Sequence, residues 1–323
     1  MLFRMMGDSD VDGPADRGRL TTERRSDASA AFDTLSVEEA LRLINREDAT
    51  VAAAVQRAVP ALVPVVEAVV AALRRGGRLI YIGAGTSGRL GVLDSSECPP
   101  TFHCDPEQVV GVIAGGDRAL RHSVEGAEDD DAAGRRRIDE LEIGADEVVV
   151  GIAAGGTTPY VHGALAAARA RGAVAALLCC VPAEQIAPDD ATRDLADHVI
   201  AMPVGPEILT GSTRMKSATA TKMALNMITT TAMARLGKIW GNLMVDLRAT
   251  NDKLLDRAAR IVSEQGPVSR SEALDLLRAA SGRVKVALVM ARRGVDAAAA
   301  EALLAEHDQN LRAVIGAPRG GKH

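Results

Sequence analysis

The sequence predicts an α/β protein in which helices cover both faces of a parallel β-sheet. Five short runs rich in Val, Ile and Leu alternate with longer stretches of helical spacing. Near-continuous apolar runs indicate strands buried on both faces, and the intervening helices make such a sheet parallel. The expected strands are 78–82, 109–113, 147–152, 173–180 and 198–204.

Helical segments precede and follow these runs. Over 36–73 the apolar residues recur at helical spacing, and Ser36 can form a capping box with Glu39. A long helix is expected over 211–236, and after a linker at 252–267 two or three short helices form a small bundle. The expected domain limits are 1–34 for a disordered leader, 35–262 for the α/β domain with its N-terminal helices, and 263–323 for a helical C-terminal domain.

Composition excludes several classes of function. The 323 residues fit one large α/β domain with a smaller appendage. Only 2% of residues are aromatic and the net charge is −5, which argues against a nucleic acid partner. The four cysteines lack CxxC spacing, which suits reduced thiols. Neither a secretion signal nor a run of ~18–20 uncharged apolar residues is present, so we expect a cytoplasmic protein without a membrane partner.

A glycine-rich turn containing Gly85, Thr86 and Ser87 follows the first expected strand and opens a helix. Glycines let the backbone approach a ligand closely, and the helix start presents unpaired N–H groups and the positive end of its dipole. The turn therefore predicts an anion site, with a phosphate monoester as the favoured ligand. It also satisfies GxGxxG, but the next strand ends in Ala-Gly-Gly-Asp rather than directly in an acidic residue. A dinucleotide site and a purely structural turn remain the alternatives.

The same chemistry recurs after the third expected strand, in Gly155, Gly156, Thr157 and Thr158. Thr158 is expected as an N-cap because a proline follows it at the first helical position. The carboxyl ends of parallel strands meet at one edge of a sheet, so the two turns can hold two ends of one sugar phosphate.

Charged residues supply further candidates. Glu97 stands before Cys-Pro-Pro at the expected end of a helix, where a carboxylate does not stabilise the helix. A second acidic cluster, 125–131, contains Glu128 but otherwise fits a solvated helix start. In a third segment, Ser212 and Thr213 are expected to cap a helix whose first turn carries basic side chains, which oppose the dipole. We therefore expect an anionic ligand or a subunit contact there. The six histidines form no HxH or HExxH pattern, so no metal site is expected.

Several long motifs together resemble one enzyme family, the N-acetylmuramic acid 6-phosphate etherases. The strings are GAGTSGRLGVLDSSECPPTF, VEGAEDD, GIAAGGTTPY, GPEILTGSTRMKSATATK and GNLMVDLRATNDKL, in order and at matching spacing over residues 35–314. The resemblance implies a sugar isomerase (SIS) type domain, which is a flavodoxin-like sheet sandwiched by helices, with a helical C-terminal portion. It also implies a homodimer whose sites lie near the subunit interface.

The resemblance further implies the reaction. These enzymes remove D-lactate from the C3 ether of N-acetylmuramic acid 6-phosphate during cell-wall recycling, giving N-acetylglucosamine 6-phosphate without a metal or other cofactor. The family's acid falls on Glu97 and its base on Glu128, and both are expected to be partly buried so that their pKa values suit this role. The substrate-binding residues that follow from the motifs are Gly85, Thr86, Ser87, Gly155, Gly156, Thr157, Thr158, Glu207, Ser212 and Lys216.

One departure and two rival functions stand beside this interpretation. The family usually has Ser-Gly-Arg-Thr where this chain has residues 155–158, so backbone N–H groups and Thr157 are expected to replace a hydroxyl and a guanidinium. One rival is a sugar-phosphate-binding regulator like the glucokinase regulatory protein, which needs no paired acid and base. The other is an aldose–ketose isomerase, which needs no acid for an ether leaving group.

Overall fold

The computed structural model describes residues 18–186, 195–247 and 252–320. Five described strands form one parallel sheet in the order β2-β1-β3-β4-β5. This order places a topological switch point between β1 and β3, where α/β sheets bind ligands. The sheet confirms the predicted α/β class, and the strands differ from the expected runs only at their ends. They are β1 (Leu79–Gly83), β2 (Val109–Ile113), β3 (Val148–Ile152), β4 (Val174–Cys179) and β5 (His198–Ala201).

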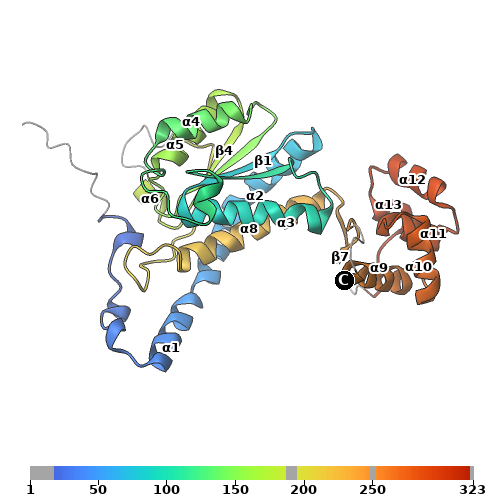
Figure 1. Ribbon diagram of the computed structural model, residues 1–323, viewed down its shortest axis with the longest axis horizontal. Coiled ribbons are helices and arrows are strands. Elements are labelled where there is room, and N and C mark those ends of the chain that lie inside the picture. The colour runs from blue at the N-terminus through green and yellow to red at the C-terminus, as the bar shows by residue number, and fades with distance from the viewer. Residues whose placement is uncertain (1–17, 187–194, 248–251, 321–323) are drawn as a thin grey trace, which may run out of the picture.

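Helices cover both faces of the sheet (Figure 1). Alternate residues of each strand join different core clusters, since successive side chains point to opposite faces: Tyr81 belongs to one cluster, Ile80 and Ile82 to the other. The first cluster is shared with α2 (Val51–Arg74), α3 (Gly85–Phe102) and α8 (Lys216–Arg235). The second is shared with α4 (Asp131–Glu140), α5 (Pro159–Ala170) and the short α6 (Ala183–Ile186).

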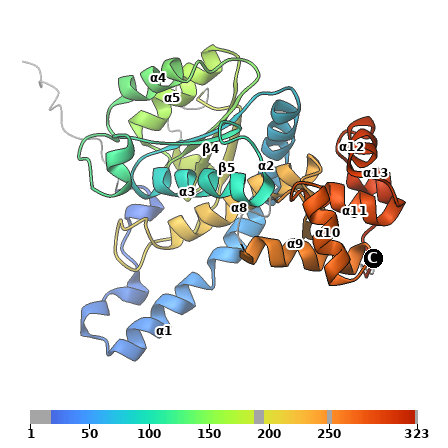
Figure 2. The ribbon, with the colours of Figure 1, turned by 45° about the vertical axis from the view of Figure 1, so that its right-hand side comes forward.

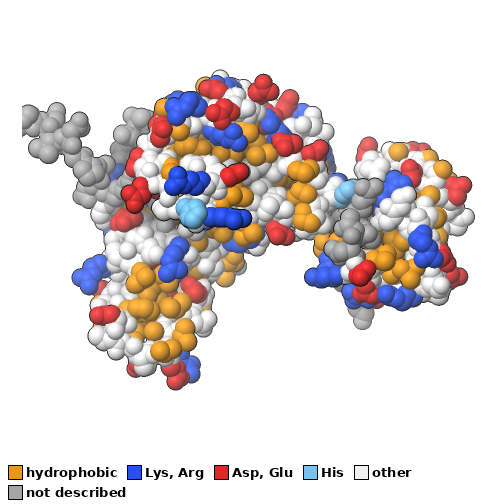
Figure 3. Space-filling model, in the orientation of Figure 1, with side chains coloured by type: hydrophobic (Ala, Val, Ile, Leu, Met, Phe, Trp, Pro, Cys, Tyr) orange, Lys and Arg blue, Asp and Glu red, His pale blue; other side chains and the backbone are white. Residues whose placement is uncertain are grey.

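Helix α1 (Val37–Asp48) extends away from the sheet as an arm (Figures 1 and 2). The predicted capping box is present, because Ser36 accepts from the Glu39 N–H and the Glu39 carboxylate accepts from the Ser36 N–H. Hydrophobic side chains gather on this arm (Figure 3), and Val37 is 78% exposed. The arm therefore presents an apolar face that the described residues do not cover.

The stretch Val37–Arg74 meets the length and composition of a membrane-spanning helix, the one such stretch among the described residues. Core helices of many proteins pass the same test. Much of α2 is buried against α8 and the sheet, so the match is weak evidence for a membrane span.

Residues 18–34 correct the expectation of a disordered leader over 1–34. They form three short 3₁₀ helices, η1 (Thr21–Glu23), η2 (Asp27–Ser29) and η3 (Phe32–Thr34). Leu20 is 2% exposed and Thr22 is fully buried, while the backbone N–H and hydroxyl of Thr21 both donate to Gln185 Oε1 at 2.9 Å. The polar composition concealed these few anchoring side chains. Residues 1–17 lie outside the described residues.

The C-terminal region corrects a second expectation. The predicted linker 252–267 is largely helix α9 (Asp252–Gln265), and the predicted domain limit at 262 falls inside it. Its buried residues pack with α10 (Arg270–Ala279), α11 (Val284–Arg293), α12 (Ala297–Glu306) and α13 (Leu311–Ile315). The same core includes Trp240 from a small hairpin formed by β6 (Ile239–Trp240) and β7 (Leu243–Met244). The indole N–H of Trp240 donates to the Gly316 carbonyl at 2.8 Å. The amphipathic pattern of α9 is the signal that the linker interpretation overlooked.

The buried cysteines give the first testable prediction. All four are free and buried, and burial raises the pKa of Cys98, Cys179 and Cys180 to about 12. Because the thiolate is the reactive form, we expect dithionitrobenzoate at pH 8 to react far more slowly with the native protein than with the same protein unfolded in urea. The released thionitrobenzoate is followed at 412 nm. Complete reaction of several thiols of the native protein within ~10² s would contradict the packing.

Candidate active site

The first glycine-rich turn forms the open start of α3 at the carboxyl edge of the sheet. Ala84 occupies the N-cap position and offers no capping side chain. Within the described chain, the N–H groups of Gly85, Thr86 and Ser87 have no hydrogen-bond partner. The predicted uncapped helix start is therefore present, and such starts can bind anions, while anion binding at this turn stays a prediction.

Close packing fixes the position of this helix start. A Cβ atom on Gly88 would lie 2.6 Å from the Gly83 carbonyl oxygen, and one on Gly91 would lie 2.9 Å from Tyr81 Cβ. Only glycine allows α3 to approach β1 so closely. The start of the helix is therefore held against the end of the strand.

A pocket of about 290 Å³ lies beside this turn. It brings Gly85 together with Glu128, although the two residues follow different strands of the sheet. The loop that carries Glu128 is anchored to α5, the helix after β3, because the Tyr160 N–H donates to the Glu128 carbonyl at 3.0 Å. The remaining lining residues come from the same turn, from α3 and from the loop after β2: Ala84, Arg89, Ala114, Ala119, His122, Ser123, Val124, Glu125, Gly126 and Ala127.

The second glycine-rich turn does not line this pocket; the N-terminal segment covers it instead. A Cβ atom on Gly155 would lie 3.3 Å from Leu20 Cδ1 and 3.7 Å from Thr22 Oγ1. The Thr22 hydroxyl is buried and has no hydrogen-bond partner within the described residues. Thr158 does stand at the N-cap of α5, but its side chain makes no capping bond. The first turn, not the second, is therefore the open one.

Glu97 lies far from the pocket within this chain. Helix α3 continues through Pro99 and Pro100 to Phe102, so Glu97 stands inside the helix and not at its end. It follows Gly85 by twelve positions, which corresponds to about 18 Å along the helix axis. Both Glu97 and Glu128 are exposed, contrary to the expected partial burial. A single chain thus does not bring the predicted acid and base together.

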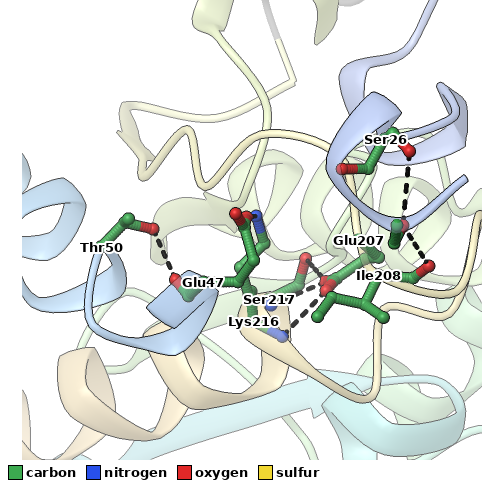
Figure 4. A network of polar contacts seen from close by, with 8 residues as sticks. Ser26, Glu47, Thr50, Glu207, Ile208, Lys216 and Ser217 are labelled. Carbon is green, nitrogen blue, oxygen red and sulfur yellow. Dashed lines mark hydrogen bonds and ion pairs between the residues drawn. The ribbon is translucent and has the colours of Figure 1, made fainter. Parts of the chain in front are cut away.

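The third predicted segment contains its own anion. Glu207 is fully buried, and its carboxylate accepts from the N–H groups of Lys216 at 3.0 Å and Ser217 at 2.9 Å, and from the Ser217 hydroxyl at 2.8 Å (Figure 4). Helix α8 begins at Lys216, so Ser212 and Thr213 do not cap it. The expected anion at this helix start is therefore a side chain of the protein, where it satisfies N–H groups and the dipole.

Lys216 is likewise engaged inside the chain. Its side chain is 4% exposed, and its ammonium group lies 2.9 Å from a carboxylate oxygen of Glu47 at the end of α1. Figure 4 shows this pair beside the Glu207 cap. Nearby, the Ser29 hydroxyl donates to the Ile208 carbonyl at 2.8 Å. These contacts join the N-terminal segment, α1 and α8.

Two pocket residues escaped the sequence interpretation. Arg89 belongs to the recognised GTSGR motif, but it was not singled out. His122 was set aside with the other histidines because no spacing pattern pointed to it. For Arg89 the sequence did contain a signal. It follows Gly85 by one helical turn, so the two residues share a face of the helix.

Comparisons with known proteins identify relatives over nearly the whole chain. Residues 61–169 match the family model described as the glucokinase regulatory protein N-terminal SIS domain. An N-acetylmuramic acid 6-phosphate etherase of Synechococcus sp. (strain CC9605) is 50% identical over 310 residues, which are 96% of this chain and 96% of the relative. Another, of Gloeobacter violaceus, is 54% identical over 275 residues, which are 85% of this chain and 88% of the relative.

Among solved structures, the phosphoheptose isomerase GmhA of Neisseria gonorrhoeae aligns with a TM-score of 0.45 and 15% identity, covering 62% of this chain and 100% of that one. The sequence relatives carry the assignment. Identity near one half across almost the full length of both sequences establishes that this chain belongs to the N-acetylmuramic acid 6-phosphate etherase family.

Proposed function

We propose that this protein cleaves the D-lactyl ether of N-acetylmuramic acid 6-phosphate in the cytoplasm, giving N-acetylglucosamine 6-phosphate and D-lactate. The observation that carries the proposal is the pocket in which the uncapped start of α3 and the Glu128 carboxylate lie together. The helix start suits the phosphate, and the carboxylate suits removal of a proton from the sugar. The names of the relatives support the same substrate.

The reaction follows from the acidity of the open-chain sugar. The C1 aldehyde acidifies the C2 proton, so Glu128 can remove it as the base. Glu97, in its protonated form, donates a proton to the departing ether oxygen as the C3–O bond breaks. Water then adds to C3 of the unsaturated aldehyde, and a proton returns to C2. These steps require an acid and a base but no redox cofactor.

A homodimer would supply the acid that one chain does not bring to the pocket. Glu97 shares an exposed face of α3 with Leu93, which is 45% exposed. Further uncovered apolar surface lies in a groove of about 660 Å³ between α2 and α8, where Val59 and Val63 are exposed. Such surfaces are typical of subunit contacts. In this proposal Glu97 of one subunit completes the pocket that holds Glu128 of the other.

The decisive test of the reaction is release of D-lactate by the purified protein. N-acetylmuramic acid 6-phosphate should be cleaved, and the unphosphorylated sugar should have a kcat/KM lower by about 10²-fold or more, because each lost charge-assisted hydrogen bond costs ~1.5–3 kcal/mol. Binding without lactate release would favour the regulator, and interconversion of an aldose and a ketose phosphate would favour the isomerase. Equal kcat/KM for the two sugars would refute the phosphate assignment.

The separate roles of the two carboxylates predict separable defects. Glu97→Gln and Glu128→Gln should each lower lactate release by about 10²–10⁴-fold, the range for a positioned acid or base. The product lacks the lactyl ether but retains the C2 proton, so its exchange in heavy water reports the base alone. NMR should show exchange with Glu97→Gln but none with Glu128→Gln.

A matched control and a contrary result complete that experiment. Glu107→Gln removes an exposed carboxylate outside the pocket and should behave like the parent protein. If Glu128→Gln exchanges the proton at the parental rate, the base is another residue. Glu125, which lines the same pocket, is then the next candidate.

Mixing the two inactive variants tests whether the site is shared between subunits. When Glu97→Gln and Glu128→Gln dimers exchange subunits, half of the products are mixed dimers with one intact shared site. Lactate release should then recover to about one quarter of the parental rate. Mixing without any recovery, despite subunit exchange seen by native mass spectrometry, would mean that each site is built from one chain.

A further inference from the structure

The pocket contains a cationic side chain that the proposed elimination does not use. Arg89 lines it from α3, and the loop after β2 contributes two carboxylates, Glu125 and Glu128. We propose that Arg89 binds the carboxylate of the lactyl group and so selects sugars that carry this ether. The inference rests on the proposed function and adds a specificity-determining residue to it.

The position of Arg89 suits a ligand that already touches the helix start. It follows Gly85 by four positions, so the two residues lie on one face of α3, about 6 Å apart along the axis. The guanidinium is steadied at one nitrogen only, since Nε donates to the Leu120 carbonyl at 3.1 Å. Both Nη atoms lack a partner within the described residues. The side chain is thus oriented, yet two of its nitrogens are available.

Two groups in the pocket can each bind one of the two anionic groups of the substrate. N-acetylmuramic acid 6-phosphate carries a phosphate on C6 and a carboxylate on the C3 substituent. The pocket offers two matching receptors, the uncapped N–H groups of α3 and the Arg89 guanidinium. Neither Glu125 nor Glu128 forms an ion pair with Arg89 among the described residues, so both Nη groups can still bind an anionic ligand. A planar guanidinium binds a carboxylate through two parallel hydrogen bonds, which lysine cannot reproduce.

His122 also lines the pocket. It lies just after η4 (Asp117–Leu120), whose last residue accepts the Arg89 hydrogen bond. Its exposed imidazole can donate a further hydrogen bond to a carboxylate bound at Arg89. The assignment places the lactyl leaving group between α3 and the loop after β2.

The product sugar separates this role from binding of the phosphate. N-acetylglucosamine 6-phosphate has the phosphate and the C2 proton but no lactyl carboxylate. Arg89→Gln should lower kcat/KM for lactate release by about 10²-fold, while C2 proton exchange on the product stays within about threefold of the parent. The kcat/KM of Arg89→Lys for lactate release should lie between those of the parent and Arg89→Gln, because lysine retains the positive charge but cannot form the two parallel hydrogen bonds of a guanidinium. Arg118→Gln, an exposed arginine of η4 that does not line the pocket, should match the parent.

A substrate analogue closes the thermodynamic cycle. In the parent protein, converting the lactyl carboxylate into its primary amide should lower kcat/KM for release of the lactyl group about 10²-fold. In Arg89→Gln the same conversion should lower kcat/KM little further, because the carboxylate has already lost its partner. Independent, additive losses would overturn the proposal. Equal losses of lactate release and product exchange in Arg89→Gln would instead assign Arg89 to the phosphate or to folding. If the unmodified protein releases no lactate, the proposed function itself fails, and the assignment of Arg89 fails with it.

Discussion

The close contact between β1 and α3 determines where every group in the pocket stands. Glycine at 83, 88 and 91 lets the helix lie against the strand with almost no space between their backbones. Because the helix begins where the strand ends, its unpaired N–H groups are presented at the edge where the sheet order reverses. The next turn of the same helix then carries Arg89 into the pocket. A side chain at any of these glycines would push α3 away from β1 and would displace both the unpaired N–H groups and Arg89.

Local patterns in the sequence were enough to predict the sheet and several helix starts. The strands were recognisable because burial on both faces demands continuous Val, Ile and Leu, as in Val148–Ile152. The capping box of α1 was recognisable because its two partners, Ser36 and Glu39, are three residues apart. Glu128 was singled out by the family resemblance, and the structure places it in one pocket with Gly85 because both lie beyond the carboxyl ends of neighbouring strands.

Contacts between distant residues explain what the sequence concealed. The buried cap of α8 is supplied by Glu207 across an irregular loop, so nearby hydroxyls at Ser212 and Thr213 looked like better caps. The basic side chain of Lys216 opposed the local helix dipole, and its partner, Glu47, stands 169 positions earlier. The second glycine-rich turn resembled the first in composition, but only the fold reveals that Leu20 covers it. For Lys216 and for the second glycine-rich turn, the contact that determines the residue's role comes from a segment remote in sequence.

The attachment of the N-terminal segment also constrains the order in which the protein assembles. Thr21 bonds to Gln185 across 164 positions, and Ser29 bonds to Ile208 across 179. At roughly 5–20 residues per second of synthesis, Thr21 and Ser29 therefore wait on the order of ten to thirty seconds before their partners are made. During that interval α1 also lacks the start of α8, with which Glu47 forms its ion pair. The segment 18–34 is thus made before the part of the α/β domain on which it docks.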